Sequence, residues 1–141
     1  MEAEQAILAA NDAFYRALEA MDIRAMRRVW AGRPTDVCVH PGWELLVGWA
    51  DIEASWRAIF ANTATMRFEI THISMEILGE LARVSCVETI YTSPGRQGPA
   101  SRVAATNLFL RDPESGAWRM ALHHGSPIAY DEEEPEPEDV N

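Results

Sequence analysis

Two ionisable side chains occur where the surrounding residues are apolar, and both could move protons. Glu88 alternates with Ala82, Val84 and Cys86 on one face of a strand-like run. A carboxylate on such a face is paired, lies at a sheet edge, or faces a pocket in which burial raises its pKa. His40 closes an earlier apolar run, and its ordinary pKa of about 6.5 suits a proton shuttle, although it can instead cap the following turn. These residues predict acid–base chemistry with His40 or Glu88 as the catalytic base.

Tyr15 and Asn107 are the candidate hydrogen-bond donors for such a reaction. Tyr15 lies one position from the apolar stripe of a helix-like segment, so its hydroxyl reaches either the interior or the surface. Asn107 shares a strand face with Val103, Ala105 and Phe109, and is either a ligand-orienting amide or a satisfied core amide. We assign both to the site, as donors to the oxygen of a developing enolate.

The remaining histidines do not predict a metal centre. His123 and His124 are adjacent on a strand, so they point to opposite faces and cannot share one metal ion. His124 alternates with Trp118, Met120 and Leu122, which places it in the interior and in the ligand site, whereas His123 faces the other way. Metal-binding spacings and a glycine-rich phosphate loop are both missing from the sequence. We therefore expect no metal and no cofactor.

The two cysteines predict buried free thiols. Cys38 and Cys86 both lie in apolar runs, a pattern typical of a reduced, cytoplasmic protein. Cys38 is two residues from His40, about 6.6 Å along a strand, which is too far for direct activation of the thiol. A third activating group is not visible, so a cysteine nucleophile is not expected.

Five tryptophans are many for a chain of 141 residues. They could line a pocket for a flat apolar ligand, or pack in a core and a dimer interface. We assign Trp43, Trp56 and Trp118 to the ligand site.

Helix-like and strand-like periods position these candidates. Residues repeating every 3.6 positions predict three helices, at 3–20, 23–30 and about 49–62. Strands are predicted at 35–40, 43–47, 66–78, 82–93, 102–111 and 118–124, with a longer loop at 93–98. Turn residues at 79–80 and 112–116 make the later strands antiparallel hairpins. Helices followed by an antiparallel meander are an α+β order.

The central motifs carry a family resemblance. Val39-His40-Pro41-Gly42-Trp43 precedes Gly48-Trp49-Ala50-Asp51-Ile52, then Trp56 and Phe60, and the last strand ends in Ala121-Leu122-His123-His124-Gly125-Ser126-Pro127. Over roughly residues 3 to 128, these motifs and their order resemble the SnoaL-like branch of the NTF2-like (ketosteroid isomerase-like) superfamily. The resemblance implies an NTF2-like cone, with N-terminal helices packed on a strongly curved antiparallel (mixed) sheet that encloses a cavity.

The resemblance also bears on the candidate residues. In ketosteroid isomerases a helix-one tyrosine donates to the dienolate oxygen, and Tyr15 stands at about the matching place. His40 lies near their aspartate base. Because histidine replaces that aspartate, and the second aspartate of the oxyanion hole has no secure match, steroid isomerisation is not supported.

Length and charge predict one domain, residues 1–130, followed by an acidic tail at 131–141. Of the net charge of −10, seven units lie in residues 131–139, which leaves −3 for residues 1–130. The tail contains prolines and little to bury, so we expect it to be disordered, and to aid solubility or dock a basic partner. The sequence forms no basic patch and has no apolar run of the roughly 20 residues that span a bilayer, so nucleic-acid and membrane partners are not expected.

Together these features predict a cytoplasmic protein that binds a small hydrophobic ligand. The favoured function is cofactor-independent acid–base catalysis, of isomerase, cyclase or dehydratase type, on a hydrophobic carbonyl compound. The alternative is a non-catalytic ligand-binding or dimeric association domain. Apolar residues on both strand faces, Leu108 and Leu110 opposite Val103 and Phe109, favour a homodimer.

Overall fold

The computed structural model describes residues 2–93 and 100–129. The predicted acidic tail and nearly all of the predicted loop at 93–98 lie outside these ranges. The helices are α1 (Glu2–Ala20), α2 (Ile23–Val29) and α3 (Trp49–Ala61); the strands are β1 (Val37–Val39), β2 (Leu46–Val47), β3 (Arg67–Leu78), β4 (Leu81–Tyr91), β5 (Ser101–Arg111) and β6 (Trp118–Pro127). Each element was predicted, with ends that differ by a few residues.

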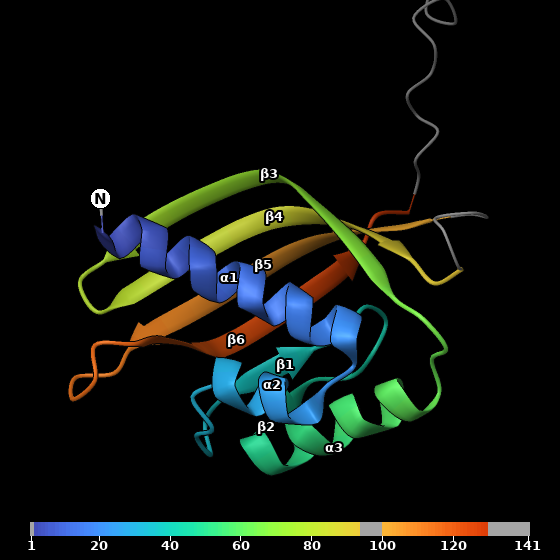
Figure 1. Cartoon of the computed structure of the whole chain (residues 1–141), viewed down its shortest axis with the longest axis horizontal. Coiled ribbons are helices and arrows are strands. Elements are labelled where there is room, and N and C mark those ends of the chain that lie inside the picture. Colours follow the sequence, from blue (N-terminus) through green and yellow to red (C-terminus); the bar gives the residue numbers. More distant parts are fainter. Residues whose placement is uncertain (1, 94–99, 130–141) are drawn as a thin grey trace, which may run out of the picture.

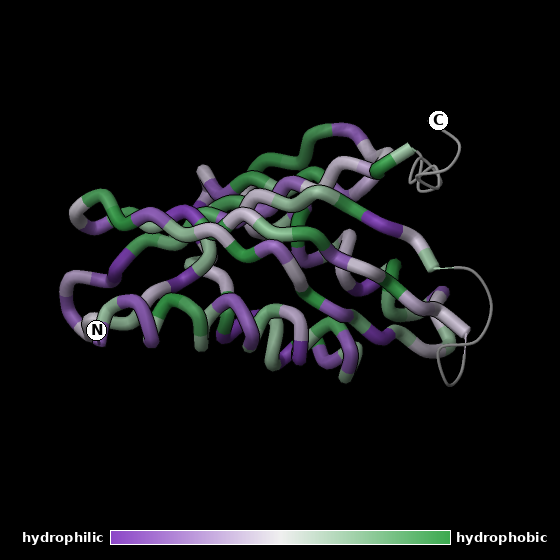
Figure 2. The backbone as a smooth tube through the Cα atoms, turned by 90° about the horizontal axis from the view of Figure 1, so that it is seen from above, coloured by the Kyte–Doolittle hydropathy of each residue, from purple (hydrophilic) through white to green (hydrophobic). Residues whose placement is uncertain are grey.

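The strands form one curved sheet in the order β2-β1-β6-β5-β4-β3 (Figure 1). All neighbours are antiparallel except β1 and β6, which are parallel, so the sheet is mixed. Figure 2 shows α1 as a separate layer along one side of the sheet, and Figure 1 shows α2 and α3 beside its β1–β2 end. The predicted α+β architecture, with helices packed on a curved mixed sheet, is confirmed.

The core lies between the helices and the facing side of the sheet. Phe14 of α1 and Ile52 of α3 are fully buried there, and every second residue is buried from Ala82 to Glu88 of β4 and from Val103 to Phe109 of β5. The short helix α2 begins where predicted because the Asp22 carboxylate accepts hydrogen bonds from the backbone N–H groups of Arg24 and Ala25. Burying one apolar face of each element fixes the position of the polar residues on the same face.

A β-bulge in β6 reverses the expected orientation of its histidines. Phe109 pairs with Met120, but Leu108 pairs with Leu122, so Ala121 is an extra residue in β6. Beyond the bulge the alternation is shifted by one: His123 is buried and His124 is exposed. The prediction that His124 faces the interior and His123 the other way is therefore wrong.

Candidate functional site

A cavity of about 250 Å³ lies between the helices and the sheet. Its walls are mainly apolar side chains, which include Leu18, Trp56, Ile59, Met66, Phe68 and Ile90. The ionisable groups in the walls are Glu88 of β4, His123 of β6, and His40, which follows β1. A cavity of this size and character accepts a small, largely hydrophobic molecule and offers it a few polar contacts.

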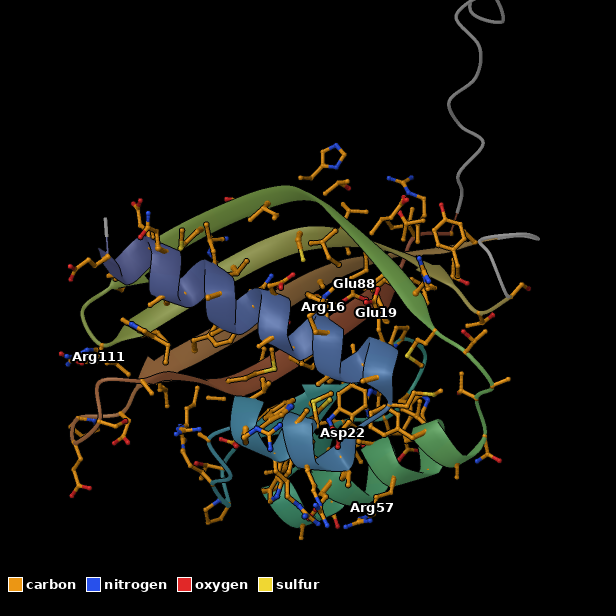
Figure 3. The ribbon with its side chains drawn as sticks, viewed as in Figure 1. Arg16, Glu19, Asp22, Arg57, Glu88 and Arg111 are labelled. Carbon is orange, nitrogen blue, oxygen red and sulfur yellow. The ribbon has the colours of Figure 1, made fainter. Side chains whose placement is uncertain are left out.

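Glu88 is the carboxylate of this cavity. Its side chain is 3% exposed, and Figure 3 shows it where α1 crosses the sheet. Oε2 accepts a hydrogen bond of 2.6 Å from the Tyr15 hydroxyl. Burial raises the pKa of Glu88 to about 7, while the hydrogen bond from Tyr15 opposes that rise. Glu88 therefore exchanges between acid and carboxylate near neutral pH, as a general base must.

Tyr15 points inward, so the alternative of a surface hydroxyl is wrong. The side chain is fully buried, and burial followed by the nearby charge of Glu88 raises its pKa well above the ordinary value. The hydroxyl donates its single hydrogen to Glu88 and accepts one from Asn107 Nδ2 at 3.2 Å. Cys86 Sγ lies 3.5 Å from the same oxygen. Tyr15 thus holds the carboxylate in place.

Asn107 is the centre of a buried polar network. Its Nδ2 donates to Asn11 Oδ1 at 2.8 Å and to the Tyr15 hydroxyl, and its Oδ1 accepts from His123 Nδ1 at 2.6 Å. Both amide hydrogens are therefore used within the protein. Of the two alternatives predicted for Asn107, the geometry corresponds to a satisfied core amide.

His123 was not predicted as a site residue, yet it lines the cavity. It is 3% exposed, and burial, followed by the charges of His40 and His124, lowers its pKa to about 3. The ring is therefore neutral at pH 7. Nε2 lies 4.0 Å from Glu88 Oε2. The sequence signal was the histidine pair itself, but only the bulge at Ala121 decides which of the two faces inward.

His40 also lies in the cavity wall, but its ring is engaged. Nε2 is 2.8 Å from Ser55 Oγ, and that hydroxyl donates its own hydrogen to the Ile52 carbonyl at 2.6 Å. His40 must therefore donate Nε2–H to Ser55. Burial lowers the pKa of His40 to about 4, which makes it a weak base. The backbone carbonyl of His40 accepts from Trp43 N–H, so the residue also closes the predicted turn.

The thiols are free and buried, as predicted. Cys38 Sγ nevertheless lies 3.8 Å from both ring nitrogens of His40, closer than the expected separation. Burial, followed by the charge of Glu88, raises the pKa of Cys38 above its ordinary value, so the thiol stays protonated. Contact with His40 does not activate it.

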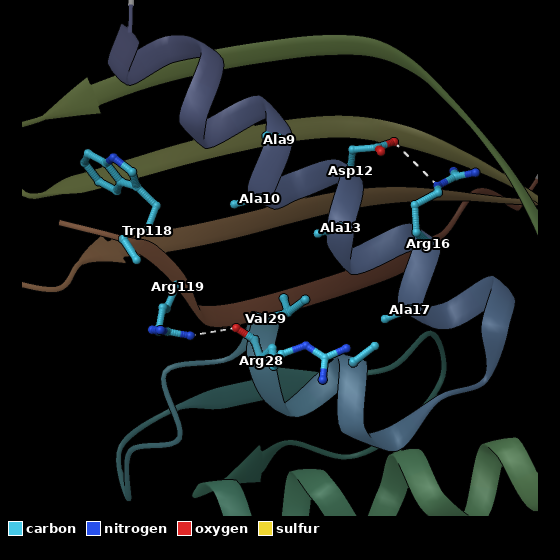
Figure 4. Close-up of a pocket in the computed structure, with 12 residues that line it drawn as sticks. Ala9, Ala10, Asp12, Ala13, Arg16, Ala17, Arg28, Val29, Trp118 and Arg119 are labelled. Carbon is cyan, nitrogen blue, oxygen red and sulfur yellow. Dashed lines mark hydrogen bonds and ion pairs between the residues drawn. The ribbon is translucent and has the colours of Figure 1, made fainter. Parts of the chain in front are cut away.

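The predicted tryptophans divide between two places. Trp56 is buried against His40, with ring centroids 4.4 Å apart, and Trp43, 45% exposed, lines the same cavity. Trp118 lies outside it, in a groove between α1, α2 and β6 (Figure 4). His124 lies on the opposite face of the sheet. Trp118 and His124 are therefore not brought together with the other predicted residues.

The groove of Figure 4 is larger, about 550 Å³, but it lacks a buried reactive group. Its floor is mostly alanine, Arg16 pairs with Asp12, and Arg119 donates to the backbone carbonyl of Arg28. The smaller cavity contains the titratable groups with shifted pKa values, which is why we take it as the candidate site.

Within residues 2–93 and 100–129, His, Cys, Asp and Glu side chains form no group of three or more that could hold a metal ion. Over the same ranges, no helix is both long and apolar enough to cross a membrane.

Comparisons with known proteins agree with this architecture. A family model described as a SnoaL-like domain matches residues 7–131. A proposed dehydratase of the NTF2-like family from Streptomyces avermitilis has a TM-score of 0.80 and 32% identity, over 89% of this chain and 96% of that one. A proposed calcium/calmodulin-dependent protein kinase type II association domain from Thiobacillus denitrificans has a TM-score of 0.76 and 31% identity, over 85% and 93%.

One curated protein sequence also matches. F-box protein SKIP8 of Arabidopsis thaliana is 25% identical over 130 residues, which is 92% of this chain. The chain spans about half, 53%, of the length of that relative.

Proposed function

This chain belongs to the SnoaL-like domain family of the NTF2-like superfamily, and from that premise we propose that it catalyses proton transfer on a small hydrophobic carbonyl compound, without a cofactor. The observation that supports catalysis most directly is Glu88, a buried carboxyl group in the wall of an apolar cavity, with one oxygen held by Tyr15. The similarity to a proposed dehydratase, at 32% identity, also supports a reaction of isomerase, cyclase or dehydratase type.

Glu88 is the base in this proposal. As a carboxylate it removes a proton from the carbon beside the ligand carbonyl, and as the acid it returns that proton to another atom of the ligand. His40 is the weaker candidate because its Nε2–H is donated to Ser55 and its pKa is about 4. Tyr15 contributes by orienting Glu88 and by favouring its charged form.

The hydrogen-bond donor to the developing enolate oxygen is a different residue in this proposal from the two predicted from the sequence, Tyr15 and Asn107. Tyr15 donates its hydrogen to Glu88, and Asn107 donates both amide hydrogens to other protein groups. Trp56 has a buried indole N–H with no hydrogen-bond partner among the described residues, and its ring lines the cavity. This nitrogen is fully buried, so we propose that it becomes the donor when the indole ring turns toward a bound ligand.

The second candidate function is a non-catalytic ligand-binding or association domain. The similarity to a proposed kinase association domain, at 31% identity and a TM-score of 0.76, favours it. In that case the cavity binds a ligand without transforming it, or has no function of its own, and Glu88 abstracts no proton.

Turnover of 5-nitrobenzisoxazole distinguishes the two functions. A base removes the ring C–H proton of this small apolar probe, the N–O bond breaks, and a coloured cyanonitrophenolate forms. We expect saturable turnover that rises with pH around 7, where Glu88 ionises. Glu88→Gln should lower kcat/KM about 100-fold. The matched control is Glu76→Gln. Glu76 is an exposed residue of β3 that does not line the cavity, so this variant should leave the rate unchanged.

Equal rates in the wild type and Glu88→Gln would contradict the assignment of Glu88 as a usable base. That result would favour the association domain.

A further inference from the structure

The buried network determines which nitrogen of His123 carries the proton. The low pKa of His123 makes the ring neutral at pH 7, so it has one N–H group. Asn107 Oδ1 can only accept a hydrogen bond, and it lies 2.6 Å from His123 Nδ1. The hydrogen is therefore on Nδ1, and Nε2 has a lone pair.

Asn11 fixes the orientation of the amide on which this depends. Asn107 Nδ2 donates to Asn11 Oδ1 at 2.8 Å and to the Tyr15 hydroxyl at 3.2 Å, so Oδ1 is the end of the amide that is turned toward His123. Asn11 and Asn107 are 3% and 0% exposed. Water therefore competes little with these contacts, and the tautomer of His123 is set by the protein.

The lone pair of Nε2 faces the carboxyl group of Glu88 without bonding to it. The 4.0 Å between Nε2 and Oε2 is too long for a hydrogen bond. One ligand oxygen can lie within hydrogen-bond distance of both atoms. Among the described residues, Nε2 makes no hydrogen bond, and both His123 and Glu88 line the cavity.

We propose that His123 is a specificity-determining residue that accepts a hydrogen bond from a hydroxyl group of the ligand, and that Asn11 and Asn107 are positioning residues that keep Nε2 unprotonated for it. The inference rests on the cavity as the ligand site, as proposed above, and does not require that the ligand be turned over.

A hydroxyl group fits this pair of atoms better than a carbonyl group does. The hydroxyl donates its hydrogen to His123 Nε2, and its oxygen accepts one from Glu88 Oε2 when Glu88 is the acid, a state in which the Tyr15 hydroxyl turns its own hydrogen to Cys86 Sγ, 3.5 Å away. A carbonyl oxygen has no hydrogen and would meet the Nε2 lone pair directly, which leaves a buried acceptor unsatisfied. The ligand class is therefore a hydrophobic compound with a hydroxyl group, in addition to the carbonyl group that proton transfer needs.

Binding of three matched bicyclic probes tests the proposal. Tetralin, 2-tetralone and 2-tetralol share one carbon skeleton and differ only at a single position. By isothermal titration calorimetry at pH 6, where Glu88 is mostly the acid, we expect 2-tetralol to bind about tenfold more tightly than 2-tetralone. His123→Leu removes the acceptor and should bring the two affinities within about twofold. The control Leu8→Ala lies on exposed α1 surface and should keep the preference.

Nitrogen-15 NMR of the His123 ring gives a second readout, in the wild-type protein itself. We expect Nδ1 to resonate as a protonated nitrogen and Nε2 as an unprotonated one. Asn107→Leu should mix the two tautomers. A purely structural role of Asn107 would lower the stability of this variant and leave the tautomer of His123 unchanged.

A proton on Nε2 in the wild type, or a ketone that binds as tightly as the alcohol, would overturn the proposal. Failure of all three probes to bind, together with no turnover of the benzisoxazole, would contradict the ligand site and both proposals with it. Preference for the alcohol without any turnover of the benzisoxazole would contradict only the catalytic function.

Discussion

At the scale of single residues, the site combines one titrating carboxyl group with two neutral histidines. Burial acts on all three, but in opposite directions: it raises the pKa of Glu88 to about 7 and lowers those of His40 and His123 to about 4 and 3. At neutral pH the histidines are hydrogen-bonding groups, and only Glu88 changes its charge. Glu88 is thus the group whose ionisation should link function to stability.

Glu88→Gln should stabilise the protein increasingly as the pH rises. The folded pKa of Glu88 is about 7, above the value of 4.5 expected in the unfolded chain, so the folded state binds the extra proton between these pH values. The contribution of Glu88 to the stability of the wild-type protein is fully present below about pH 4.5 and is lost as the pH rises through 7. The free energy of unfolding of the variant minus that of the wild type should therefore increase by up to about 3 kcal/mol between pH 4 and pH 8.

Urea unfolding of both proteins at pH 4, 6 and 8 measures this difference. The two histidines contribute equally to both proteins, so their own titration cancels. A difference that is constant across the pH range would mean that Glu88 has an ordinary pKa in the folded protein.

At the scale of elements, regular strands made the site predictable and irregular ones did not. Glu88 and Asn107 face inward as the two-residue alternation predicted, because β4 and β5 pair without a bulge. The bulge at Ala121 has no sequence signature, so the alternation predicts His124 in the interior where the structure has His123. Tyr15 and Glu88 are 73 positions apart, and a local pattern cannot predict their contact.

Gly125 shows how closely β6 approaches the cavity walls. A Cβ atom at this position would lie 3.0 Å from Val103 Cγ1 and 3.2 Å from Pro41 Cγ, and both of these residues line the cavity. Gly125→Ala should therefore lower the free energy of unfolding by about 1–3 kcal/mol and weaken ligand binding. Urea unfolding and calorimetric titration with 2-tetralol measure the two effects.

Ser126→Ala, at the exposed neighbouring position, is the matched control and should change neither quantity. Wild-type stability in Gly125→Ala would show that Pro41 moves aside without cost.

At the scale of the whole molecule, the helices of the described residues all lie on one face of the sheet (Figure 1). The opposite face presents the side chains of β3 to β6 that alternate with the core residues. Among them Val87, Leu108 and Leu122 are partly exposed. This face thus carries apolar side chains among polar ones such as Arg83, the cross-strand partner of Leu108, and the homodimer predicted from the sequence would bury them.

We expect the protein to be a dimer through this face. A stable interface buries about 800 Å² on each partner, and charge is depleted from its centre, so an arginine in the middle of the sheet should prevent association. Leu108→Arg, on the central strand β5, should yield a folded monomer in sedimentation-velocity experiments, with an unchanged circular dichroism spectrum. Leu8→Arg adds the same charge to exposed α1 surface and should remain dimeric.

A wild-type monomer would contradict the dimer, and a dimeric Leu108→Arg variant would place its interface elsewhere. Because the cavity lies on the helix side of the sheet, the monomeric variant should still bind 2-tetralol, which separates assembly from ligand binding.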